Sequence, residues 1–276
     1  MHILQSMIKL FSSIAIILFI SCNSQGERSQ STTFQNNINT DTLNYSYKTH
    51  KDISYYLVEN EEDVDTAYFQ ISYPFFSDTT LNNILKPFIL VDGDESIETA
   101  AEAFIWGFNE FVEESSTQNI SFPWYKNVKS EVWTNTPFLL TLATAVDEYT
   151  GGAHGNHYTI ISNIDVQNKK KIGLKDIIDK EKIIELTKIA ETQFRKNENL
   201  SDSASLEKDF FFENGTFDIN DNFGLTKNSL IIYYNEYEIR PYAEGPTLLE
   251  IPYSTMENLL NPTGKKYVNS IKQSLN

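Results

Sequence analysis

The sequence has very little cysteine and few basic side chains. Cys22 is the only cysteine among 276 residues, which excludes an intramolecular disulfide and a cysteine nucleophile in the folded part. The sequence has 22 Lys and Arg but 38 Asp and Glu, so the formal net charge is −16. A non-specific nucleic-acid binder needs a basic surface to displace counterions from phosphates, and this composition excludes that class.

Glycine, proline and known catalytic motifs are also scarce. The 11 Gly and 8 Pro do not fit a collagen-like chain. The chain contains no GxSxG, HExxH, P-loop or GxGxxG pattern, so the common hydrolase, zinc-protease and nucleotide-binding motifs are absent from the sequence. By contrast, 40% of the residues are hydrophobic and 13% are aromatic, which is enough for one large domain or two small ones.

The first 21 residues have the features of a secretory leader. The apolar run at 10–20 is shorter than the roughly 20 residues that span a bilayer, so residues 1–21 are predicted to be a signal peptide. The run ends in Ser21-Cys22, which looks like a bacterial lipobox and predicts lipidation of Cys22 after cleavage. We therefore expect a cell-envelope protein anchored in a membrane, in first place the outer membrane, on its periplasmic or surface side. An ordinary signal peptide or a stop-transfer helix with a chance cysteine are the alternatives.

Composition and periodicity divide the rest of the chain. Residues 22–50 are rich in Ser, Gln, Asn and Thr and predict a flexible tether. Strands followed by a helix occur twice, which favours an α+β fold with two small lobes of antiparallel sheet, each with a packed helix. The expected ranges are an N-terminal lobe at 51–149, a C-terminal lobe at 150–262 and a polar tail at 263–276.

Individual elements follow from the spacing of apolar residues. The helices are expected at 95–115, 179–196 and 256–260, the last with Ser254 as its N-cap. The strands are expected at 53–59, 66–73, 128–134, 138–149, 158–167 and 248–253, with a further hairpin around 227–228. Both faces of 138–149 begin apolar, so this strand is predicted to be central in its sheet.

The most distinctive motif is Gly151-Gly152-Ala153-His154-Gly155-Asn156-His157. We favour a tight turn between two strands, with glycines at positive φ and His154 fixing the loop by hydrogen bonds. A second interpretation is a zinc site made by His154 and His157 with Asp147 or Glu148. A third is direct ligand contact through His154, Asn156 and His157. We expect no metal and no cofactor.

A second motif is Pro241-Tyr242-Ala243-Glu244-Gly245-Pro246. Pro241, Gly245 and Pro246 predict a rigid connection after a strand. Arg240, Tyr242 and Glu244 are candidate ligand contacts, because Tyr and Arg are common anchors of binding surfaces. The alternative is a bulged turn with buried tyrosines, which we favour.

At these two motifs the chain resembles a known family. The run 150–155, the hairpin at 169–171 and Leu174-Lys175-Asp176 resemble the extracellular domain of RsiV-type anti-sigma factors. The same arrangement is similar to the non-catalytic N-terminal region of PdaC-type peptidoglycan deacetylases. The runs 237–245 and 251–253 match the second signature of that family, and 71–74 resembles the opening of its first half.

The resemblance implies an exported, two-lobed α+β binding domain. In RsiV-type members this domain binds lysozyme and signals through a transmembrane helix. The anti-sigma role and the deacetylase activity are not expected here, because the sequence shows neither a cytoplasmic segment nor a catalytic domain. We expect a non-catalytic lipoprotein that binds a lysozyme-like cationic protein or peptidoglycan. The alternative is a glycan hydrolase that uses acidic residues near His154.

Overall fold

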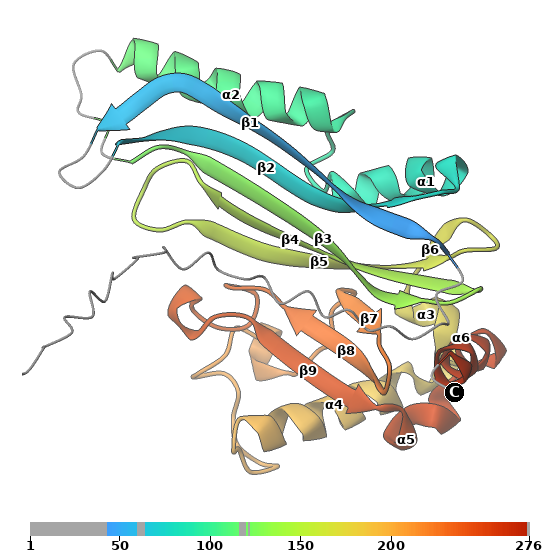
Figure 1. Ribbon diagram of the computed structural model, residues 1–276. Helices are drawn as coiled ribbons and strands as arrows, with labels where there is room; N and C mark the ends of the chain where they lie inside the picture. Colours follow the sequence, from blue (N-terminus) through green and yellow to red (C-terminus); the bar gives the residue numbers. More distant parts are fainter. Residues whose placement is uncertain (1–42, 60–63, 116–119, 121, 275–276) are drawn as a thin grey trace, which may run out of the picture. The chain divides into compact units, whose positions relative to one another are not determined.

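The computed structural model describes residues 43–59, 64–115, 120 and 122–274. They form an α+β fold with one six-stranded and one three-stranded sheet (Figure 1). The predicted class, two sheets with packed helices, is therefore confirmed. The expected signal peptide and Cys22 lie outside the described residues, as does the tether up to residue 42.

The larger sheet consists mainly of antiparallel neighbours. Its strands, in spatial order, are β1 (Tyr45–Glu59), β2 (Val64–Phe76), β3 (Tyr125–Asn135), β4 (Leu139–Tyr149), β5 (Asn156–Asp165) and β6 (Lys170–Ile172). Only β2 and β3 are parallel. Parallel neighbours need a long crossover connection, and here the chain between them forms two helices.

These two helices, α1 (Thr79–Ile89) and α2 (Ile97–Glu114), cover one face of the larger sheet (Figure 1). Ala101 of α2 and Leu85 of α1 are fully buried against Ile71 and Leu142 of the sheet. The apolar face of α2 thus makes the first core, as its periodicity predicts. Within the described residues no helix lies on the opposite face of the sheet, and the smaller sheet covers part of that face (Figure 1).

The smaller sheet has its own helices and core. Its strands are β7 (Phe223–Leu225), β8 (Ser229–Tyr234) and β9 (Thr247–Pro252). The helices are α3 (Leu174–Ile177), α4 (Ile183–Asn197), α5 (Tyr253–Met256) and α6 (Pro262–Gln273), with short 3-10 turns η1 (Lys180–Lys182), η2 (Glu213–Gly215), η3 (Tyr242–Glu244) and η4 (Glu257–Leu259). Phe194 of α4 and Tyr267 of α6 are fully buried in this second core.

Hydrogen bonds from polar side chains join the two sheets. Asn163 of β5 donates to the Phe223 carbonyl oxygen at 2.7 Å, and Thr134 donates to the Leu225 carbonyl oxygen at 2.6 Å. A Cβ atom on Gly224 would lie 3.0 Å from a methyl group of Ile161, a tight contact, so glycine favours the close approach of β7 to β5. The two lobes therefore share buried polar contacts.

Three expected boundaries are corrected. Strand β1 begins at Tyr45, inside the range 22–50 predicted as tether, because alternation extends the strand beyond its apolar part. The boundary after Tyr149 separates β4 from β5, which pair along their whole length in one sheet. The polar tail 263–276 is largely helix α6, which buries Tyr267, Val268 and Ile271.

Two local predictions also fail. Ser254 is not an N-cap, because α5 already begins at Tyr253 after Pro252. Helix α1 is missed, since Pro87 inside it is a residue that normally ends a helix. The prediction that the strand at 138–149, now β4, lies in the interior of its sheet is confirmed. No helix in the described ranges combines the length and apolar character needed to cross a membrane.

Candidate ligand-binding site

The β4–β5 hairpin brings the glycine motif to one end of the larger sheet. Gly151 and Gly152 have φ of +109° and +96°, which confirms the predicted turn with glycines at positive φ. The Tyr149 hydroxyl donates to the Gly152 carbonyl oxygen at 3.1 Å. At Gly155 a Cβ atom would lie 3.0 Å from the Glu148 carbonyl oxygen, so a side chain here would be tightly crowded.

His154 connects this hairpin to the second lobe. Its imidazole stacks on the Tyr242 ring, with centroids 4.0 Å apart and an interplanar angle of 20°. The Tyr237 hydroxyl lies 3.3 Å from Nε2 of His154, and Nδ1 lies 2.8 Å from the Gly155 carbonyl oxygen. His154 therefore holds the loop through both ring nitrogens and one ring face.

His157 lies beside this contact on strand β5. Its Nδ1 is 2.9 Å from Oδ1 of Asp147, the residue opposite it on β4. The side chains of His157 and Asp147 are 40% and 46% exposed, whereas Oδ1 of Asp147 itself is buried. The His157 ring is also 6.1 Å from the Tyr242 ring. We call His154, His157, Asp147, Tyr237 and Tyr242 the loop cluster.

A row of tyrosines continues from the loop cluster across the uncovered face of the sheet. Tyr68, Tyr125 and Tyr149 are direct register partners on β2, β3 and β4. Their rings are nearly parallel, with centroids 5.9 Å and 6.0 Å apart. A Cβ atom on Gly155 would lie 3.4 Å from the Tyr125 hydroxyl and 3.3 Å from Nε2 of His157, so the tyrosine row and the loop cluster are continuous.

Three phenols of this surface, those of Tyr68, Tyr125 and Tyr242, have a raised pKa. Burial, followed by the charge of Asp147, raises the pKa of Tyr125, and the same two causes raise the pKa of Tyr68. Loss of hydration, followed by the charge of Glu236, raises the pKa of Tyr242. These groups therefore act as hydrogen-bond donors and as apolar ring surfaces rather than as nucleophiles or bases.

Several predicted contacts are placed elsewhere. Arg240 forms an ion pair with Glu198 at 2.5 Å and lies over the Phe210 ring, so it belongs to the second lobe rather than to the loop cluster. Glu244 and Asn156 are exposed. Pro241 precedes η3 and Gly245 follows it at φ +69°, so the motif forms a turn. The favoured expectation of buried tyrosines in this turn is wrong, since Tyr237 is 57% exposed and Tyr242 is half-buried.

The zinc interpretation finds no ligand set. Among the described residues, His, Cys, Asp and Glu side chains nowhere form a group of three or more that could hold a metal ion. His157 faces Asp147, and the Nδ1 and Nε2 atoms of His154 already have neighbours in the loop. Glu148 instead pairs with Lys126 at 2.6 Å.

The tyrosine row was missed by sequence reasoning. Its members come from three strands and meet only through strand register, because residues that alternate along each strand share one face. The parity of 138–149 already placed Tyr149 and Asp147 together. The sequence did not show that Tyr125 pairs with Tyr149 and that Tyr68 pairs with Tyr125.

Comparisons with known proteins agree with this architecture. Residues 58–157 match the family model described as Deacetylase PdaC, and residues 175–254 match the one described as Protein of unknown function (DUF3298). No curated protein matches the chain.

Two solved structures have a similar fold. A member of the DUF3298 family from Bacteroides fragilis NCTC 9343 is 23% identical, with a TM-score of 0.66 over 85% of this chain and 99% of that one. A DUF3298 family protein from Pseudomonas aeruginosa PAO1 is 20% identical, with a TM-score of 0.61 over 81% and 96% of the two chains. The resemblance found in the sequence is thereby confirmed, because the PdaC match covers 58–157 and the DUF3298 match covers 175–254.

Proposed function

We propose that this chain is a lipid-anchored envelope protein whose folded part binds a cell-wall ligand, in first place a peptidoglycan glycan, without turning it over. The observation that carries this proposal is the continuous surface of the tyrosine row and the loop cluster. It combines partly exposed aromatic rings with hydroxyl, imidazole and carboxylate groups. Sugars present apolar ring faces and many hydroxyl groups, which such a surface can match.

The arrangement of carboxylates favours binding over hydrolysis. A glycosidase places two carboxyl groups on either side of one bond, about 5 to 9.5 Å apart. Asp147 and Glu148 follow each other along β4, so their side chains lie on opposite faces of the sheet. Asp147 pairs with His157, and Glu148 with Lys126. The alternative of a glycan hydrolase would be supported by turnover of muropeptides that is lost in His154→Ala.

A pull-down with purified peptidoglycan sacculi tests the binding proposal. The full chain is expected to sediment with sacculi, and Tyr125→Ala and Tyr242→Ala are each expected to weaken binding about tenfold, the loss of roughly 1.4 kcal/mol. Phe211→Ala, at a 55% exposed aromatic residue of the second lobe, is the matched control and should bind normally. Absence of wild-type binding would overturn the proposal.

The membrane anchor is tested separately at Cys22. We expect Cys22→Ala, or treatment with globomycin, to block processing of residues 1–21 and to release the protein from the membrane fraction. Unchanged fractionation in both experiments would contradict lipidation.

A lysozyme-like cationic protein is the second candidate ligand. The net charge of −16 favours it, since a field of this sign steers a basic partner and is screened by salt. Biolayer interferometry against lysozyme should show binding at low salt that weakens at high salt. Absence of binding at low salt would remove this candidate.

A further inference from the structure

Strand β1 is an edge of the larger sheet and exposes unusually large apolar side chains. The order of strands places β1 outermost among the described residues. Ile53, Tyr55 and Leu57 are 60%, 70% and 67% exposed, and Trp106 on the neighbouring helix α2 is 61% exposed. Exposed strand edges invite pairing with another chain, and clustered apolar residues beside them mark interaction sites.

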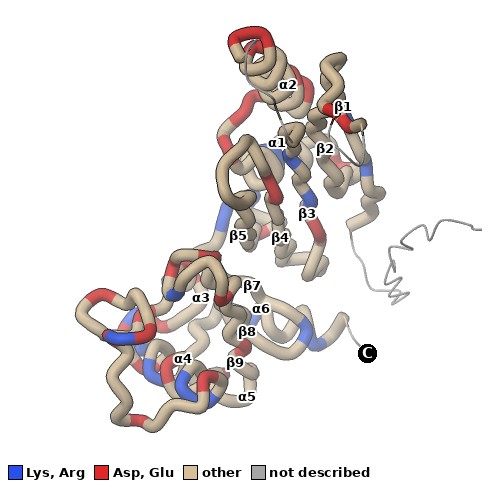
Figure 2. The backbone as a smooth tube through the Cα atoms, turned by 90° about the vertical axis from the view of Figure 1, so that its left-hand side faces the viewer, with Lys and Arg blue, Asp and Glu red and all other residues tan. Residues whose placement is uncertain are grey.

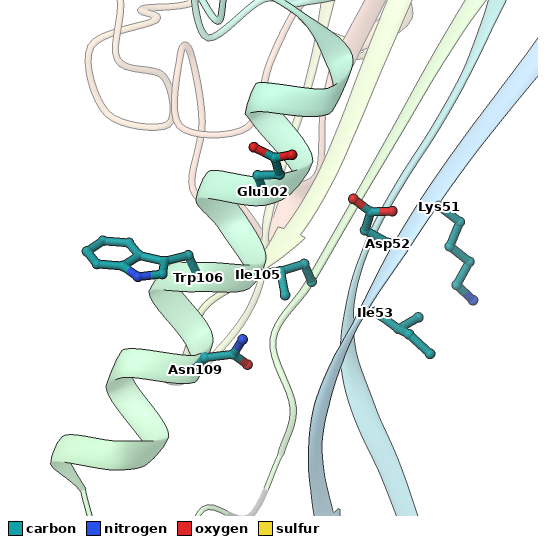
Figure 3. Close-up of a pocket in the computed structure, with 7 residues that line it drawn as sticks. All are labelled: Lys51, Asp52, Ile53, Glu102, Ile105, Trp106 and Asn109. Carbon is teal, nitrogen blue, oxygen red and sulfur yellow. The ribbon is translucent and has the colours of Figure 1, made fainter.

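A groove of about 530 Å³ runs between this strand and helix α2. It is lined by Lys51, Asp52, Ile53, Glu102, Ile105, Trp106 and Asn109 (Figure 3). Figure 3 shows Asp52 and Glu102 on the side where strand and helix face each other, whereas Lys51 points to the other side of the strand. The Lys51 ammonium lies 4.8 Å above the Tyr68 ring, and within the described residues it forms no ion pair with Asp52 or Glu102.

The charge of the groove indicates the kind of partner. Helix α2 carries five glutamates and no Lys or Arg, as the red segments in Figure 2 show. Glu102 makes no ion pair within the described part of the chain, and Asp52 faces only His50, at 3.3 Å. A second copy would bring carboxylates against carboxylates, which is unfavourable, whereas Lys or Arg side chains would neutralise them.

Local geometry limits where strand pairing could occur. The register of β1 shifts between Ile53 and Leu57, where Ser54 accepts a hydrogen bond from the Tyr56 backbone N–H. Such a bulge interrupts a regular edge. The stretch before it, 47–53, is regular and ends at the groove. A peptide added along this stretch would therefore reach Asp52 and Glu102 with its side chains.

We propose that the edge of β1 at 47–53 binds an extended basic segment of a partner protein, which adds as a further strand and places a Lys or Arg side chain in the groove between Asp52 and Glu102. Strand addition supplies backbone hydrogen bonds, and the groove supplies specificity for the cation. Like the lysozyme-like ligand considered above, the proposed partner is basic, but the two proposals have nothing else in common. The proposal is also independent of glycan binding, since none of these groove residues belongs to the tyrosine row or the loop cluster.

Fluorescence anisotropy with a labelled, capped hexapeptide of alternating Arg and Val tests the proposal on the full chain. We expect binding at low salt, no binding of the corresponding Glu and Val peptide, and at least a tenfold loss in Asp52→Asn/Glu102→Gln. The control variant Glu110→Gln/Glu114→Gln also removes two negative charges, but from α2 outside the groove, and should bind within about twofold of wild type.

Backbone pairing is tested with the same peptide carrying N-methyl groups on alternate amides, which removes the donors for strand pairing. This peptide is expected to lose binding. Equal binding of the methylated peptide, equal loss in both double variants, or no binding to wild type would each overturn the proposal. Sacculus binding in Asp52→Asn/Glu102→Gln should equal wild type, which separates this outcome from failure of glycan binding.

Discussion

Gly264 and Gly107 both lie in helices, but their surroundings differ. A Cβ atom on Gly264 in α6 would collide with the carbonyl oxygen of Ile177, which is fixed backbone. A Cβ atom on Gly107 in α2 would meet only the Trp124 ring, at 3.7 Å, an ordinary van der Waals contact. The same added methyl group therefore has opposite effects at the two positions.

Alanine substitutions at these glycines test this difference. Gly264→Ala should lower the free energy of unfolding by about 3 kcal/mol, because the backbone must shift to admit the methyl group. Gly107→Ala should raise it by about 0.5 to 1 kcal/mol, since alanine loses less entropy than glycine in a helix. Urea denaturation at pH 7 measures both. A stabilised Gly264→Ala would contradict the close approach of α6 to Ile177.

Asp165 is a buried carboxylate with several donors. Its Oδ2 accepts from the Tyr267 hydroxyl at 2.7 Å, and its Oδ1 accepts from the Asn168 backbone N–H at 2.8 Å. Burial by itself raises the pKa of Asp165, but these hydrogen bonds outweigh it and hold the pKa below its usual value. A depressed pKa stabilises the fold above the unfolded pKa of about 3.9, and this contribution is lost as the pH falls.

Tyr267→Phe tests this linkage. We expect the free energy of unfolding to fall by about 2 kcal/mol at pH 7, because a hydrogen bond to a charged group is lost. The difference from wild type should shrink only as the pH falls from the unfolded value of about 3.9 through the depressed native-state pKa of Asp165. Denaturation curves at pH 7 and at a series of pH values below about 3.9 check both points, and a difference independent of pH over this whole range would contradict the role of Asp165.

At the scale of elements, apolar periodicity predicted long segments better than their ends. Helix α2 was expected at 95–115 and spans Ile97–Glu114, because its buried face repeats clearly. Helix α6 was missed although Gly264, Tyr267, Val268 and Ile271 follow helical spacing, since the lysines between them made the segment resemble a tail. Ser254 is not the predicted N-cap, whereas Ser96 and Thr99 form a capping box at the start of α2.

This capping box gives a prediction for α2. Ser96 Oγ accepts from the Thr99 N–H at 3.1 Å, and Thr99 Oγ1 accepts from the Ser96 N–H at 3.0 Å. Ser96→Ala should therefore destabilise the protein by about 1 kcal/mol, whereas Ser96→Asp, which can also cap, should stay within about 0.5 kcal/mol of wild type. Thermal unfolding of the two variants distinguishes a cap from a general surface effect.

At the scale of the whole molecule, buried side-chain hydrogen bonds hold the two sheets together in addition to the chain that connects them. Asn163 donates to the Phe223 carbonyl oxygen and accepts from Thr141 Oγ1 at 2.9 Å and from the Leu225 N–H at 3.3 Å. The sequence predicted two lobes but not this junction, since nothing local to Asn163 shows that β7 will approach it. For the same reason the register that builds the tyrosine row could not be predicted.

Asn163→Ala tests the junction. It leaves buried backbone groups of β7 without these partners and should lower the free energy of unfolding by about 3 kcal/mol. Ser162→Ala is the matched control, because Ser162 Oγ is buried with no hydrogen-bond partner among the described residues and its removal should be nearly neutral. Equal effects of the two substitutions in urea denaturation would contradict the role of Asn163.

The second lobe borders the proposed binding surface along strand β5. Gly224 closes against Thr141 and Ile161, and nearer the hairpin Asn235 accepts from the Thr159 backbone N–H and Tyr242 stacks on His154. The tyrosine row runs from Tyr149 on β4 through Tyr125 to Tyr68 on β2, away from this border. A polymer lying on the row would therefore cross the strands and have the second lobe beside one of its ends.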